Sequence, residues 1–152
     1  MTPLPSVADQ RNRPLGVLRL SLTARCNLAC PYCCPDVADP PGLLSLEQQL
    51  RLIRVGCRLG AHTLRLTGGE PLLSEQLLPL LIKVAQGRLT PGDPLEGLQQ
   101  VALTSNGVLL TQERARALRA AGLERITISL DAVEGAVVAR MAGLRGGESA
   151  GN

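Results

Sequence analysis

The sequence predicts an α/β fold, an incomplete TIM-like (βα) barrel with about four parallel strands and three to four helices. First, short apolar stretches alternate with longer stretches of helical periodicity, which is typical of parallel strands joined by helical crossovers. Second, the polar and Gly-rich motifs directly follow predicted strands, where (βα) barrels build their sites. Third, a complete barrel usually needs at least about 200 residues, and this chain has 152, so we expect only part of one.

Each predicted element has its own local pattern. Because short runs rich in Leu, Val, Ile and Thr are bounded by turn residues, we expect strands at 17–22, 63–66, 101–104 and 126–130. Apolar residues at helical spacing predict helices at 46–59, 74–85, 112–121 and 134–142. Ser45 and Thr111 are typical N-cap residues, and Gly60 and Gly122 typically end a helix. The segment 87–97 contains two prolines and three glycines and is expected to be a loop.

The composition divides the chain into three segments and argues against a membrane partner. Residues 1–14 are polar and broken by prolines, and we expect a flexible N-terminal segment. Residues 15–143 would form the partial barrel domain, and the Gly-rich run 144–152 a disordered tail. The chain has no apolar stretch of about 18 residues and no signal-peptide pattern at its start, so we expect a cytoplasmic protein with no membrane partner.

Charge and aromatic content argue against a nucleic-acid partner. The net charge is only +3, the arginines are scattered, and Tyr32 is the only aromatic residue. Nucleic-acid binders usually have a basic stripe and aromatic side chains for stacking. We therefore expect a small-molecule partner, and the core must be built from aliphatic side chains.

The cysteines predict a metal centre. Cys26, Cys30 and Cys33 follow the first predicted strand in a C-x3-C-x2-C pattern, which favours a metal site over a disulfide framework. Three thiolates would hold three irons of a four-iron cluster and leave the fourth iron open for a ligand. The alternatives are a structural zinc site or reactive surface thiols; zinc prefers four ligands, and the only near candidate is Cys34, next to Cys33. Cys57 lies on the apolar face of a predicted helix, as a small hydrophobe would.

The motifs at the other strand ends carry weaker information. In the segment 68–71 (GGEP), glycines allow a backbone to approach a ligand closely, and Glu70 could accept hydrogen bonds from an ammonium group. The alternative is an ordinary turn with a helix-capping glutamate. The segments 104–107 (TSNG) and 129–131 (SLD) are, taken singly, typical of turns and caps.

The cysteine motif, with Tyr32 just before the last cysteine, resembles the signature of the radical S-adenosylmethionine (SAM) superfamily. The resemblance implies that Cys26, Cys30 and Cys33 bind a [4Fe–4S] cluster whose open iron chelates SAM. An electron donor would reduce the cluster, and SAM would be cleaved to a 5′-deoxyadenosyl radical.

Longer segments resemble the GTP 3′,8-cyclase family of molybdenum cofactor biosynthesis: LRLSLTARCNLACPYC, LRLTGGEPLL, LTSNG and AGLERITISLD. This resemblance implies SAM contacts at Tyr32, Gly69, Glu70 and Ser129. It implies GTP contacts at Arg19, Arg65 and Thr104. Two arginines also suit a triphosphate on chemical grounds, although they could instead form ion pairs within the barrel.

The implied reaction joins C3′ of the GTP ribose to C8 of the guanine and gives 3′,8-cyclo-7,8-dihydro-GTP. The family carries a second [4Fe–4S] cluster on three later cysteines, and this sequence has none after Cys57. We therefore expect the isolated chain to be a poor or inactive cyclase that needs a second copy or a separately supplied C-terminal half. The alternatives are another radical SAM enzyme of related architecture and a non-catalytic cluster-binding fragment.

Overall fold

The computed structural model describes residues 7–33 and 38–143, which form an α/β unit around a four-stranded parallel sheet. The sheet order is β1-β2-β3-β4, with every neighbouring pair parallel. The strands are β1 Val17–Ser21, β2 Thr63–Thr67, β3 Gln100–Ser105 and β4 Arg125–Ile128. Because each strand adds to the edge left by the previous one, the sheet winds in one direction, as in part of a (βα) barrel. The predicted fold class is confirmed.

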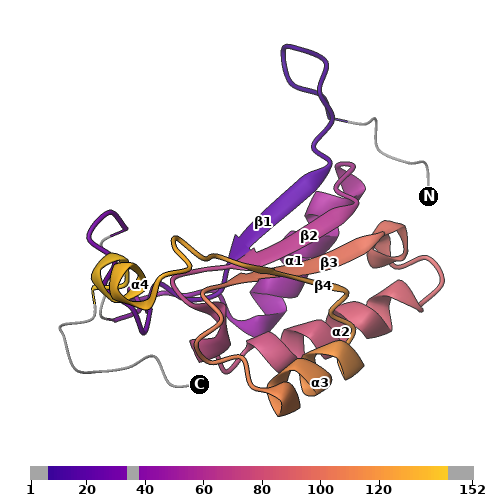
Figure 1. The fold of residues 1–152 in the computed structure, drawn as a ribbon. Helices are drawn as coiled ribbons and strands as arrows, with labels where there is room; N and C mark the ends of the chain where they lie inside the picture. Colours follow the sequence, from indigo (N-terminus) through magenta and orange to yellow (C-terminus); the bar gives the residue numbers. More distant parts are fainter. Residues whose placement is uncertain (1–6, 34–37, 144–152) are drawn as a thin grey trace.

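The first three helices lie on one side of the sheet, as Figure 1 shows. They are α1 Leu46–Arg58, α2 Leu77–Arg88 and α3 Gln112–Ala120. Ser45 caps α1 in a complete capping box with Gln48, and the side chain of Thr111 caps α3, so both predicted N-caps are confirmed. A fourth helix, α4 Gly135–Met141, lies apart from these three, near the loop that carries the cysteines (Figure 1).

The largest differences from the prediction lie in two segments. The helix predicted at 74–85 starts and ends later, because Pro71–Leu73 forms a short 3₁₀ helix of its own (η1) and Gln76 becomes the N-cap of α2. The segment 87–97 is not simply a loop, since α2 continues to Arg88 and Pro94–Gly97 forms a second 3₁₀ helix (η2). Burial explains the second difference: Leu95 of η2 is fully buried in the core.

The core lies between the sheet and the three helices and is aliphatic, as expected from the composition. Alternate strand residues point into it, which is the pattern of a sheet with one covered face. Its fully buried members include Ile53, Leu64, Leu66, Leu80, Leu81, Val101 and Leu103. The opposite face of the sheet carries no helix in the described part of the chain (Figure 1).

The described part of the N-terminal segment forms a closed turn. Ala8 bridges to Pro14, and Asp9 forms an ion pair with Arg13. The predicted tail at 144–152 lies outside the described residues. Within the ranges that the structure covers, no helix is long and apolar enough to cross a membrane.

Candidate functional site

Three arginines occupy one row on the open face of the sheet. Arg19 of β1 pairs in register with Arg65 of β2, Arg65 pairs with Ala102 of β3, and Ala102 pairs with Arg125 of β4. Residues in register on adjacent strands point to the same face, and strands lie about 4.8 Å apart. The row therefore places three guanidinium groups over a strip about three strand spacings wide. Two residues further along β3, Thr104 pairs with Thr127 and lies on the same face.

These arginines lack protein partners within 7–33 and 38–143. The ion pairs formed there use other arginines, and no hydrogen bond from the side chain of Arg19, Arg65 or Arg125 occurs in those ranges. Like charges on adjacent strands repel each other, so an unpaired basic row favours an anionic ligand. Sequence reasoning missed Arg125, because only the β3–β4 register shows that it shares a row with the other two.

The GGEP loop lies directly against the cysteine loop. The backbone N–H of Gly69 donates to Thr23 O at 2.8 Å, and that of Glu70 donates to Arg25 O at 2.7 Å. A Cβ atom on Gly69 would lie 2.2 Å from Arg25 O. The expected close backbone approach is therefore made to the cysteine loop, and only glycine fits there.

The carboxylate of Glu70 is fully buried and bound by protein donors. One oxygen accepts from Leu72 N (3.0 Å) and Ser105 Oγ (2.9 Å), and the other accepts from Asn106 N (2.8 Å). The bond to Leu72 N is a helix-capping bond, as in the alternative interpretation of this motif. Through the two bonds from Ser105 and Asn106, Glu70 joins the end of β2 to the end of β3.

Asp39 holds the start of the cysteine loop. Its carboxylate accepts hydrogen bonds from Thr23 Oγ1 (2.5 Å), Ala24 N (2.7 Å) and Arg25 Nε (2.9 Å). The bond from Thr23, together with those from Ala24 and Arg25, lowers the pKa of Asp39 below its usual value. The sequence offered no indication of this role, because the prolines and aspartates around Asp39 indicate only a loop.

The far end of the cysteine loop contacts the segment after β4. The hydroxyl of Tyr32 donates to the carboxylate of Asp131, and Ala29 N donates to Ala142 O at the end of α4 (3.1 Å). The bond to Asp131, followed by the nearby Cys30 thiol, raises the pKa of the Tyr32 phenol. Ser129, two residues before Asp131, is exposed, and its N–H donates to Ser105 O (2.9 Å).

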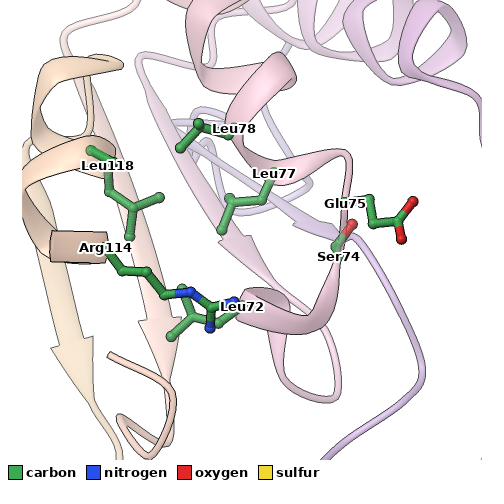
Figure 2. Close-up of a pocket in the computed structure, with 8 residues that line it drawn as sticks. Leu72, Ser74, Glu75, Leu77, Leu78, Arg114 and Leu118 are labelled. Atoms are coloured by element: carbon green, nitrogen blue, oxygen red, sulfur yellow. The ribbon is translucent and has the colours of Figure 1, made fainter. Parts of the chain in front are cut away.

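A separate hollow of about 270 Å³ lies between α2 and α3 on the helical side of the sheet. Figure 2 shows leucines on its walls and the side chain of Arg114 reaching across it. None of the predicted site residues lines this hollow. The candidate site is therefore the region where the cysteine loop meets the ends of the strands and the open face.

A protein-family model described as the radical SAM superfamily matches residues 20–149. The chain belongs to the radical SAM superfamily. The protein of Parasynechococcus marenigrum (strain WH8102) named GTP 3′,8-cyclase is 76% identical over 143 residues, which are 94% of this chain and 41% of that relative. The protein of the same name from Synechococcus sp. (strain WH7803) is 71% identical over 151 residues, or 99% of this chain and 44% of the relative. This chain thus spans less than half the length of these curated relatives.

Among solved structures, Streptococcus suis SuiB bound to S-adenosylmethionine has a similar fold. The TM-score is 0.65, with 21% sequence identity, and the similarity covers 87% of this chain and 28% of that chain. At this identity the similarity concerns the fold alone. It agrees with the incomplete barrel described above.

The cysteines fit the cluster that radical SAM proteins use. Cys26, Cys30 and Cys33 are free thiols on one loop, and Cys33 is exposed. Across the described ranges, no three His, Cys, Asp or Glu side chains are placed to hold a single metal ion. A four-iron cluster does not need such a set, since each thiolate binds a different iron. Cys34 lies outside the described residues, and Cys57 packs against the core, where burial raises its pKa.

Proposed function

We propose that this chain supplies the cluster-, SAM- and phosphate-binding part of a GTP 3′,8-cyclase. The observation that carries the proposal is the 76% identity to a protein of that name across nearly the whole chain. The row of unpaired arginines on the open face supports a polyphosphate substrate independently of the name.

In the proposed site, Cys26, Cys30 and Cys33 bind a [4Fe–4S] cluster, which supplies the electron for the cleavage of SAM. Gly69 brings the GGEP backbone against the cysteine loop, where the SAM methionine would lie. Glu70 keeps that loop in place. In its proposed contact with the SAM amino group, one carboxylate oxygen would accept a hydrogen bond from SAM in addition to those it accepts from the protein. Tyr32 and Ser129 are the proposed contacts for the rest of SAM.

The triphosphate of GTP would lie along the arginine row. Arg19 and Arg65 are adjacent in register, and Arg125 extends the row to the other side of Ala102. Guanidinium groups donate two parallel hydrogen bonds to phosphate oxygens, which fixes the orientation of the ligand as well as its charge. Thr104 lies nearer the carboxyl ends of the strands, where the ribose would lie between the phosphates and SAM.

The test is anaerobic reconstitution of the chain with iron and sulfide, followed by reduction with dithionite in the presence of SAM. We expect about four irons per chain and release of 5′-deoxyadenosine. Substituting Cys26, Cys30 or Cys33 by serine should abolish both, whereas Cys57→Ser is the matched control and should retain both. A wild-type chain that binds no four-iron cluster under these conditions would contradict the proposal.

A second candidate is a cluster-binding fragment that does not cyclise GTP alone. These residues match only 41% of a relative's length. We propose that residues corresponding to the rest of that relative, in the same chain or in another, complete the pocket. Addition of the remaining part of a relative should then restore formation of the cyclic nucleotide, while 5′-deoxyadenosine release needs this chain only.

Free thiols fit a reducing compartment, and we propose that the protein works in the cytoplasm with a cellular electron donor.

A further inference from the structure

Asn106, directly after β3, contacts the sulfur of the first cluster cysteine. Its side-chain Nδ2 lies 3.7 Å from Cys26 Sγ and donates to Asn27 Oδ1 at 2.9 Å. We propose that Asn106 is a positioning residue that donates a hydrogen bond to the Cys26 thiolate and raises the reduction potential of the cluster. The inference rests on the proposed function only in requiring that the cluster binds.

The surrounding bonds fix which side-chain atom of Asn106 faces the cysteine. Asn106 Oδ1 accepts from Val108 N at 3.0 Å, so the oxygen is used within its own turn. The amide nitrogen must then point the other way, toward Cys26 and Asn27. The backbone N–H of Asn106 donates to the buried carboxylate of Glu70 at 2.8 Å, which holds the whole residue in place.

A second N–H group points at the same sulfur. Leu28 N donates to Cys26 Sγ at 3.5 Å. The sulfur is a thiol here, and it stands for the thiolate that Cys26 becomes on binding iron. Two amide donors on one thiolate stabilise negative charge there, and hydrogen bonds to sulfur are one of the means by which a protein sets cluster potential.

The direction of the effect follows from the charge. Reduction adds one electron to the cluster, so the reduced state gains more from an N–H donor than the oxidised state does. Loss of the Asn106 amide should therefore lower the potential. A hydrogen bond to a charged group contributes about 1.5–3 kcal/mol, and both redox states keep much of it. A difference of about 1 kcal/mol between the two states corresponds to roughly a fivefold change in the ratio of oxidised to reduced cluster at a fixed applied potential.

Two variants separate this role from that of an ordinary turn residue. Asn106→Asp keeps an oxygen for Val108 N but replaces the donor by a negative group beside Cys26. Asn106→Ala removes both the acceptor and the donor. Because a new negative charge beside the cluster lowers the potential by itself, the uncharged Ala variant decides between the two roles. If Asn106 only shapes the turn, a fully loaded Asn106→Ala chain should keep the wild-type potential; if Asn106 donates to the sulfur, that potential should fall, and it should fall further in Asn106→Asp.

The experiment is a redox titration of the reconstituted chain, followed by electron paramagnetic resonance of the reduced cluster, with iron content measured on each sample. We expect an oxidised-to-reduced ratio about fivefold higher for Asn106→Ala at a fixed potential, and higher still for Asn106→Asp. The matched control is Gln112→Glu, the same amide-to-carboxylate change at an exposed position on α3, and its potential should equal that of the wild type.

The outcomes distinguish this inference from the proposed function. If the wild type binds no cluster, the proposed function fails. If all chains bind about four irons and the Asn106 variants keep the wild-type potential, the proposed function stands and this inference is wrong. If both variants lose iron while their circular dichroism is unchanged, Asn106 acts only in holding the loop, which also overturns the role in setting the potential.

Discussion

Replacement of Gly69 by alanine tests how the GGEP loop supports the cysteine loop. The new Cβ would lie 2.2 Å from Arg25 O and 2.5 Å from Ala24 O, whereas real Cβ contacts essentially never fall below 3.0 Å. Arg25 O must therefore move by at least about 0.8 Å, the difference between those limits. Both obstacles are backbone atoms, so no side-chain rotation relieves the contact.

The displacement breaks or strains the two backbone hydrogen bonds between the loops, Gly69 N to Thr23 O and Glu70 N to Arg25 O. Each such bond contributes about 1 kcal/mol, and overpacking costs about 1–3 kcal/mol more. We expect Gly69→Ala to lower the free energy of unfolding by about 3–5 kcal/mol. Because Cys26 directly follows Arg25, the variant should also bind less iron on reconstitution.

Urea unfolding and iron analysis measure these two effects. The control is Gly97→Ala, since a Cβ at Gly97 would meet no atom within 4 Å. That variant should unfold and bind iron as the wild type does. If Gly69→Ala also keeps the wild-type unfolding midpoint and iron content, the two loops are not held together as described, and the reasoning is refuted.

Three further predictions concern stability and thiol reactivity. Glu70→Gln places an amide where a buried carboxylate accepts three hydrogen bonds, and it should lower the free energy of unfolding by about 2–4 kcal/mol in urea; an unchanged midpoint would contradict this. The hydrogen bond from Arg54 lowers the pKa of Asp93, so this pair stabilises the fold above pH 3.8 and the effect is lost as pH falls through the lowered pKa. Since Arg54 is partly exposed, Asp93→Asn should cost only about 1 kcal/mol at neutral pH, and its stability should converge with the wild type in acid; a constant difference down to acid pH would argue against the pairing. Burial raises the pKa of Cys57 while Cys33 is exposed, so iodoacetamide should alkylate Cys33 at least about tenfold faster before cluster loading, as followed by mass spectrometry; equal rates would oppose this.

Much of the fold could be predicted because its information is local. The alternation of strand and helix, the N-caps at Ser45 and Thr111, and the positions of the motifs after the strands are all set by short segments. The cysteine motif likewise lies within one loop. Its chemistry could be predicted from residue type and spacing, without knowing what the loop contacts.

The supporting contacts could not be predicted, because they join residues far apart in sequence. Arg125 joins the arginine row only through the β3–β4 register, and Asn106 reaches Cys26 across 80 positions of the chain. Asp39 lies in a loop whose composition indicates only a turn. The burial of Glu70 was also hidden, because a glutamate beside two glycines is equally typical of an exposed ligand and of a cap.

The sequential order of the strands has a consequence for how the chain folds during synthesis. Each new strand pairs with the one made just before it, so the sheet can grow from the N-terminus without waiting for later strands. The cysteine loop receives its supports in the same order: Asp39 first, the GGEP backbone next, and the Asn106 amide once β3 is complete. On a ribosome, the nascent loop would therefore be ordered in stages, with the contacts from Asp39 and the GGEP backbone formed before the contact from Asn106.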